Sequence, residues 1–264
     1  MAIKFTYLGY AIYIAMAAWA TAMLGYILKR HKLGSIFFAL GSAVMVFAFG
    51  LRWVQVGHVP LQNMFEVFIC MGMLMYPIWA FCHYLLGARG PAVNVAIGLI
   101  MLFPAGFVFS AQAEQLPPAL RSWLFVPHIM AYMLAYVVLI MASVQAGCVL
   151  FTPRGGNEQN IARMDKVVYI LVLLGFPLLT LGLVLGSLWG KLAWSDYWNW
   201  DPKEMFSLAT FLAFAVYLHL RALQKTGSVR LRSAVVIVGG VLVIVTLLWV
   251  NLSHLFKGMH SYAS

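Results

Sequence analysis

One short stretch of the chain concentrates aromatic side chains that could bind a flat ligand. Four of the nine tryptophans lie within twelve positions, together with a tyrosine: Trp189, Trp194, Tyr197, Trp198 and Trp200. Tryptophan favours the membrane–water interface, so an aromatic belt is one interpretation, although a belt is spread over many helix ends. Rigid aromatic faces also lose little rotamer entropy when they stack on a planar apolar macrocycle. Composition alone favours neither interpretation.

Histidine is the second residue type that could do chemistry. The chain has seven histidines. Two imidazoles can fill both axial positions of a haem iron, an arrangement that favours electron transfer or storage over oxygen binding. A zinc cluster is not expected, because the sequence has no H-x-x-x-H pair and no C-x-x-C pair.

The aromatic stretch ends in a helix start signal. Asp201, Pro202 and Glu204 have the spacing of a capping box, in which Asp is the N-cap, Pro fills the first helical position and Glu reaches back from the third. Asn63 and Glu66 have the same spacing before another apolar run. We therefore interpret both acidic residues of the loop as caps rather than as an acid–base pair, and Glu66 as a cap rather than an intramembrane proton carrier.

The composition predicts an all-α, polytopic integral membrane protein. Hydrophobic residues make up 64% of the 264 residues, charged residues make up 9%, and the mean hydropathy is +0.92. These values exclude a soluble enzyme or a nucleic-acid-binding module. Because one crossing needs about 20 residues, the apolar runs predict eight transmembrane helices in a single domain (residues 1–264) that contains an outer Trp-rich loop (residues 188–203). The runs cover residues 8–28, 33–51, 64–86, 92–110, 124–151, 167–187, 202–223 and 233–253.

The distribution of basic residues predicts the orientation. If the first loop is cytoplasmic, the inner segments hold eleven basic and two acidic residues, whereas the outer segments hold six and five. The positive-inside rule then places both termini and the Trp-rich loop outside. His219 lies 18 positions after Asp201, about 27 Å along a helix, so it cannot share an outer site. Four histidines are expected on the outer side: His58, His128, His254 and His260.

The residues in and around the loop resemble a known family. Residues 194–204 read W-S-D-Y-W-N-W-D-P-K-E, and residues 174–180 and 217–221 match the segments on either side. Further matches lie at residues 60–66, 123–128 and 258–262. This pattern resembles the CcsA (ResC) family of c-type cytochrome biogenesis proteins, whose hallmark is a Trp-rich loop ending in W-D-P-K-E. The related CcmC haem-handling proteins share the loop theme, but their motif does not usually continue as P-K-E. One departure is Ser195, where the family usually has glycine.

The resemblance implies a set of haem-binding residues. His128 and His260 are implied as the outer axial ligands of the haem iron, with His254 as a rival to His260 because it is outer and only six residues earlier. His219 is implied as a transmembrane haem ligand, together with a histidine from a partner. No covalent catalytic residue is implied. The loop residues implied in haem contact are Trp194, Tyr197, Trp198, Trp200 and Asp201.

The resemblance also implies a function and its partners. Haem b would be the transported substrate, moved to the outer face and presented to apocytochrome c for thioether attachment. A CcsB/ResB-type membrane protein would be the partner in a cytochrome c synthase complex, alongside the thiol-redox proteins of the pathway and membrane lipid, with no nucleic acid. We expect the bacterial inner (cytoplasmic) membrane with the loop periplasmic, or the thylakoid membrane if the chain is from a plastid. A haem channel or chaperone without a synthase role and a HemX-like regulatory protein are the alternatives.

Overall fold

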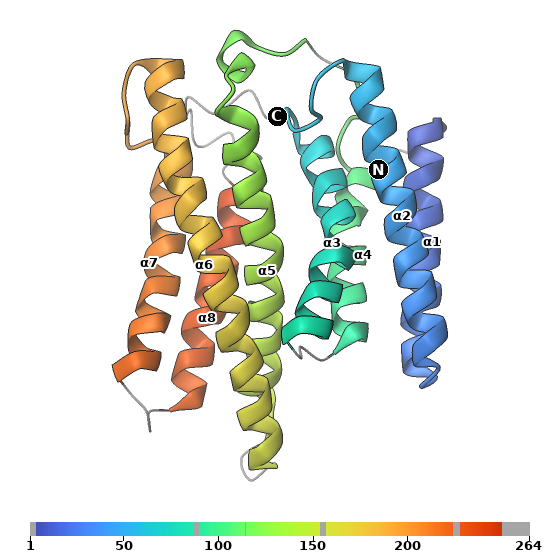
Figure 1. Ribbon diagram of the computed structural model, residues 1–264, viewed down its shortest axis with the longest axis vertical. Helices are drawn as coiled ribbons and strands as arrows, with labels where there is room; N and C mark the ends of the chain where they lie inside the picture. Colours follow the sequence, from blue (N-terminus) through green and yellow to red (C-terminus); the bar gives the residue numbers. More distant parts are fainter. Residues whose placement is uncertain (1–3, 87–89, 114, 154–156, 224–227, 250–264) are drawn as a thin grey trace. The chain divides into compact units, whose positions relative to one another are not determined.

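The computed structural model describes residues 4–86, 90–113, 115–153, 157–223 and 228–249, and these ranges contain helices and connections but no strand. The chain divides into two compact units, residues 1–121 (unit 1) and 122–264 (unit 2). Both are helical bundles (Figure 1). The expected all-α, polytopic membrane fold is confirmed, because seven helices are long and apolar enough to cross a membrane. The eighth apolar helix in the described ranges, α4, is shorter, with 17 residues.

Unit 1 contains the first four helices: α1 (Tyr7–Ile27), α2 (His31–Val56), α3 (Met64–Leu86) and α4 (Pro91–Phe107), followed by a short 3-10 turn (Pro118–Arg121). Helix α1 packs against α2 and α4, and α3 packs against the same two helices. Trp19, Phe38 and Trp79 fill the interior and are almost completely buried. The Trp19 indole N–H donates to the Phe38 carbonyl at 3.2 Å, so this large ring is buried without leaving its polar atom unsatisfied.

A buried ion pair organises one end of unit 1. The Arg52 side chain on α2 is 2% exposed and that of Glu66 on α3 is 1% exposed, and Arg52 Nε donates to Glu66 Oε1 at 2.9 Å. The guanidinium also donates to the carbonyls of Ala111 (2.8 Å) and Gln112 (3.0 Å) beyond α4. Because a buried charge is costly unless it is paired and hydrogen-bonded, this network fixes α2, α3 and the segment after α4 together.

Glu66 also caps α3, as predicted. Its backbone N–H donates to Asn63 Oδ1 at 3.0 Å, and its carboxylate accepts from the Gln62 N–H at 2.8 Å. The sequence did not reveal that Arg52 is its partner, because the two residues lie on different helices.

Unit 2 contains α5 (Phe125–Phe151), α6 (Glu158–Trp194), α7 (Pro202–Leu223) and α8 (Val229–Ile244), which continues as a π-helical turn (Val245–Trp249). Helix α5 packs against α6 and α8, and α7 packs against the same two helices. We call the end at which α6 stops and α7 starts the loop end. The opposite end, where α7 stops and α8 starts, is the basic end. Five cationic residues of the described ranges lie there: Arg163, Lys166, Arg221, Arg230 and Arg232.

Helix α6 is longer than its apolar run. The run predicts a helix over residues 167–187, whereas α6 has 37 residues and starts at the Asn157 N-cap, whose side chain accepts from the Gln159 N–H at 3.0 Å. At 1.5 Å per residue the helix is about 56 Å long, well beyond a hydrocarbon core of about 30 Å. Hydropathy detects only the apolar part of a helix, so it did not predict the polar first turns of α6 or its last two turns, which carry Trp189 and Trp194.

Removing Arg52 tests the buried ion pair. Arg52→Met keeps most of the side-chain volume but leaves the Glu66 carboxylate without its cation, so we expect the free energy of unfolding to fall by about 3 kcal/mol or more. Thermal unfolding of the purified protein in detergent measures the change. Lys32→Met, which removes an exposed cation from the first turn of α2, is the matched control and should change stability by less than about 0.5 kcal/mol. Equal effects of the two substitutions would contradict the role given to the pair.

Candidate functional site

The Trp-rich loop of unit 2 is shorter than the predicted 188–203, because α6 continues to Trp194 and α7 already starts at Pro202. It spans residues 195–201 and is held at its first residue by a helix C-cap. Helix α6 ends at Trp194, and Ser195 takes the left-handed conformation, with φ 68°. Its N–H donates to the Lys191 carbonyl at 3.1 Å. The Lys191 ammonium in turn donates to the Ser195 carbonyl at 2.6 Å and lies 5.3 Å from the centre of the Tyr197 ring. Glycine adopts positive φ without strain, so a glycine at this position would fit the observed backbone better than serine does.

The other end of the loop is held by the predicted capping box. Asp201 Oδ1 accepts from the Lys203 N–H at 2.9 Å, and Glu204 Oε2 accepts from the Asp201 N–H at 3.1 Å. The same Glu204 oxygen also accepts from the Asn199 N–H at 2.8 Å, so the carboxylate fixes the loop as well as the helix start. Asp201 is buried, at 6% exposure. The capping prediction is therefore confirmed, and the loop is clamped between two helix ends.

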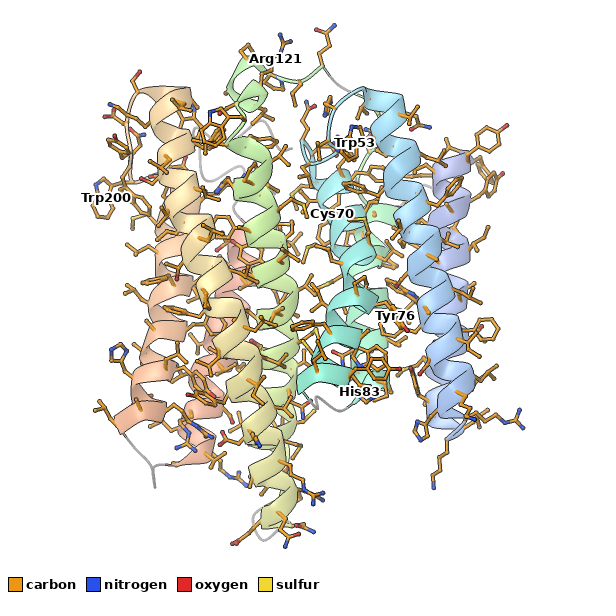
Figure 2. All side chains as sticks on the ribbon, viewed as in Figure 1. Trp53, Cys70, Tyr76, His83, Arg121 and Trp200 are labelled. Carbon is orange, nitrogen blue, oxygen red and sulfur yellow. The ribbon has the colours of Figure 1, made fainter. Side chains whose placement is uncertain are left out.

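Aromatic rings project from the clamped loop. Trp200 has a φ of 58°, an uncommon value for a bulky residue, and its side chain is 68% exposed. Figure 2 shows Trp200 at the margin of unit 2, pointing away from the helices. Trp198 packs edge-on against it at 6.1 Å between ring centres, and Tyr197 is 56% exposed. Left-handed backbone at a bulky residue is strain that the surrounding contacts must hold in place.

His128 lies in the first turn of α5 and is 8% exposed. Its Nδ1 is 2.9 Å from the Gly182 carbonyl of α6. Because a carbonyl only accepts, Nδ1 must carry the proton, and in the neutral ring Nε2 then carries the lone pair. Metal-binding histidines are usually fixed in this way, with the second ring nitrogen donating to a carbonyl or carboxylate.

Two glycines of α6 make room for the histidine. A Cβ on Gly186 would lie 2.5 Å from His128 Cε1, and a Cβ on Gly182 would lie 3.0 Å from the Tyr132 ring. His128 and Tyr132 are one turn apart on α5, as the glycines are on α6, so the pairs interlock across the helix interface. The imidazole orientation therefore depends on two residues that lack side chains.

Trp189 connects His128 to the loop. Its ring stacks on the imidazole with 5.8 Å between ring centres and an interplanar angle of 14°. The same indole meets Trp194 edge-on at 4.8 Å and is itself 1% exposed. Trp189 belongs to the aromatic stretch but is not among the predicted site residues. Its position is the signal that could have identified it: it lies seven residues after Gly182 and three after Gly186, on the helix face that packs against α5.

The predicted site residues are thus partly brought together. His128 and Trp194 are joined through Trp189, while Tyr197, Trp198, Trp200 and Asp201 belong to the clamped loop that follows. His219 lies near the opposite end of α7, exposed, with Nδ1 donating to the Ala215 carbonyl at 2.8 Å. It does not share the loop-end site, as expected. His254 and His260 lie outside the described residues.

Known proteins of one family match this chain over most of its length. A family model described as "Cytochrome C assembly protein" matches residues 13–260. The cytochrome c biogenesis protein CcsA of Guillardia theta is 32% identical over 90% of this chain and 89% of its own length. CcsA of Prochlorococcus marinus strain MIT 9303 is 33% identical, with 85% and 82% covered. CcsA of Chlamydomonas reinhardtii is 30% identical over 89% of this chain and 69% of its own length.

Substitutions of Ser195 test the strained C-cap of α6. Ser195→Gly relieves the left-handed strain, so we expect the unfolding free energy to rise by about 0.5 kcal/mol, the gain being reduced by the greater freedom of glycine in the unfolded chain. Ser195→Val places a β-branched residue at the same φ and should lower it by about 1 kcal/mol or more. Thermal unfolding measures both shifts. A valine variant as stable as the glycine variant would show that Ser195 does not adopt positive φ.

Proposed function

This chain belongs to the cytochrome c assembly protein family, and from that membership we propose that it moves haem across a membrane and presents it to apocytochrome c. A role in cytochrome c biogenesis follows from the family. What we propose beyond that role is the identity of the cargo, the residues that bind it, the partner protein and the side of the membrane on which the loop lies. Haem b is here the substrate rather than a resident cofactor.

The geometry of His128 is the observation on which the proposal depends most. The Gly182 carbonyl fixes the Nδ1–H tautomer, which makes Nε2 the ligating nitrogen, and Trp189 stacking restricts rotation of the ring. A preformed imidazole of this kind suits a haem iron. His260 is proposed as the second axial ligand, on the family resemblance alone.

We propose that the aromatic rings of the clamped loop stack on the same planar ligand that His128 binds. Exposed rings of Tyr197 and Trp200, with the half-buried Trp198 between them, offer stacking area to a macrocycle. The side-chain amide nitrogen of Asn199 is buried without a hydrogen-bond partner among the described residues. A haem propionate could accept from such a donor, which makes Asn199 an additional candidate contact that the sequence did not suggest.

The two ends of unit 2 fit opposite sides of a membrane. The cationic residues of the basic end favour the cytoplasm by the positive-inside rule, which puts the loop end in the periplasm, or in the thylakoid lumen of a plastid. His219 lies on α7 toward the basic end and is exposed, so it is available to a haem in transit and to a histidine from a second protein. We propose a CcsB/ResB-type membrane protein as that partner.

Presentation of haem would serve thioether formation. Each thiol of an apocytochrome C-x-x-C-H motif adds across a haem vinyl group, so that sulfur bonds to one vinyl carbon and a proton is gained by the other. No residue of this chain is consumed, and its part is to ligate the iron and position the vinyl groups. The thiols must be reduced beforehand, which is the part proposed for the thiol-redox proteins of the pathway.

Haem ligation can be tested with an imidazole rescue experiment. His128→Gly removes the axial ligand and leaves space for free imidazole. We expect bound haem, measured by the visible spectrum of protein co-expressed with its candidate partner, to fall at least about tenfold. Added imidazole should restore a low-spin spectrum. His58→Ala is the control, because the resemblance implies no haem contact for this outer histidine, so haem content should stay unchanged.

The outcomes separate the candidate functions. A His128→Gly protein with full haem and full cytochrome maturation would contradict the proposed site. Haem that is bound but never attached to apocytochrome c, with the partner present, would favour a haem chaperone without a synthase role. A wild-type protein without haem in every preparation would favour a HemX-like regulatory protein.

A further inference from the structure

The indole ring of Trp189 lies between the proposed axial histidine and the Trp-rich loop. Trp189 is on α6, five residues before Trp194, and is 1% exposed. On one side it faces His128 of α5, with an angle of 14° between the two ring planes. On another side it contacts Trp194, the last residue of α6, edge-on at 4.8 Å between ring centres. Trp189 is therefore a buried link between the histidine and the residue after which the loop begins.

Trp189 helps to fix the plane of the imidazole ring. The hydrogen bond from His128 Nδ1 to the Gly182 carbonyl holds one ring atom, but the ring can still turn about that atom. The indole face closes one side of the ring, and Tyr132 meets it edge-on at 5.1 Å between ring centres. Gly186 closes a further side, because a Cβ there would lie 2.5 Å from His128 Cε1. The ring plane is thus set by packing as well as by the hydrogen bond.

The plane of the imidazole decides where an iron can be bound. The Nε2 lone pair lies in the ring plane, so a metal bound to it lies in that plane as well. Turning the ring would point the lone pair away from a macrocycle that rests on the loop rings. Groups that orient a ligating histidine change metal affinity by roughly 10- to 100-fold although they never touch the metal. Trp189 has the contacts of such a group.

The contact with Trp194 connects the same indole to a strained loop. Ser195, the next residue, and Trp200 are two of the three non-glycine residues with positive φ in the described ranges. Such backbone conformations persist only while the surrounding contacts hold them. A partner that opens the loop would relieve this strain, move Trp194 and remove one of the contacts that hold Trp189 against His128.

We propose that Trp189 is a positioning residue that orients His128 for the haem iron and makes this orientation depend on the Trp-rich loop. The proposal rests on the haem function proposed above and explains how a tightly held substrate can leave. With the loop clamped, the imidazole presents Nε2 to the iron. When apocytochrome c displaces the loop, Trp194 withdraws from Trp189 and the imidazole can turn. The bond between iron and Nε2 then breaks, with the electron pair staying on nitrogen, and haem passes to the apocytochrome.

Substitutions of Trp189 test the positioning role. The protein is co-expressed with its candidate partner, and loss of haem to excess apomyoglobin is followed by the visible spectrum. Trp189→Leu removes the aromatic face, so we expect haem loss to be about tenfold faster, with part of the low-spin signal replaced by a five-coordinate one. Trp189→Phe keeps an aromatic face against the imidazole and should restore most of the wild-type rate and spectrum.

A second comparison asks whether Trp189 acts through His128. In His128→Gly protein supplied with free imidazole, the ligand is not tethered to the chain and aligns itself with the iron. Trp189→Leu should therefore change the rate of haem loss by less than about twofold in this background.

The link to the loop is tested with Glu204→Ala, which removes the carboxylate that accepts from the Asn199 and Asp201 amides. We expect this substitution to speed haem loss by about fivefold when Trp189 is present. It should add less than about twofold to Trp189→Leu, because both substitutions act on the same contact.

Trp79→Leu is the matched control. Trp79 is also 1% exposed and also stacks on an imidazole, that of His83, at 5.0 Å between ring centres and an angle of 11°. None of the described rings that it contacts is a proposed haem contact, so this variant should keep the wild-type rate of haem loss and spectrum. If Trp189→Leu does not fold, Trp189→Met, whose flexible side chain fills more of the space, takes its place in each comparison.

Three results would overturn the proposal. A wild-type rate of haem loss and spectrum in Trp189→Leu would show that the stacking is incidental. A full effect of Trp189→Leu in the imidazole-supplied His128→Gly protein would show that Trp189 does not act through His128. Fully additive effects of Glu204→Ala and Trp189→Leu would show that the loop and the histidine are independent. Full haem in His128→Gly would instead contradict the haem site itself, so the two proposals fail by different results.

Discussion

Every buried charge in this apolar bundle must have a partner, and this constraint explains most of the local structure. Three of the seven acidic residues each organise one region: Glu66 holds Arg52 in unit 1, Glu204 holds the loop amides, and Asp165 holds two arginines. In water these contacts would contribute little, whereas leaving buried Glu66 or Asp165 without its arginine costs several kcal/mol. The few carboxylates therefore mark the points where helices are joined.

The loop-end site follows from how its parts are immobilised. A C-cap at Ser195 and a capping box at Asp201 and Glu204 restrict the loop from both sides, and Trp189 extends that rigidity to His128. Rigid presentation would suit the proposed binding and release of haem, because a preformed site loses little ordering entropy on binding. The positive φ of Trp200 is a strained backbone conformation, and the two caps of the loop hold it in place.

Unit 2 combines two chemically opposite ends on the same long helices. The loop end has aromatic rings and a fixed imidazole, while the described part of the basic end has five cationic side chains and a buried phenol. Helix α7 links the two, since it runs from the Asp201 cap to Arg221 and carries His219 on the way. The haem transfer proposed above, from one membrane face to the other, would use this separation of sites. Helix α6 reaches both ends as one continuous helix.

The sequence by itself determined the features that depend on short-range order. Apolar runs predicted all eight helices, and the spacing of Asp201 to Glu204 and of Asn63 to Glu66 predicted both caps, because these signals involve residues within one turn of each other. Tertiary structure alone decided the partners of residues that are far apart: Arg52 with Glu66, His128 with Gly182, and Trp189 between His128 and Trp194. It also decided that Ser195 has positive φ and that α6 extends beyond its apolar run. Such contacts depend on which helix faces meet, and no local pattern encodes that choice.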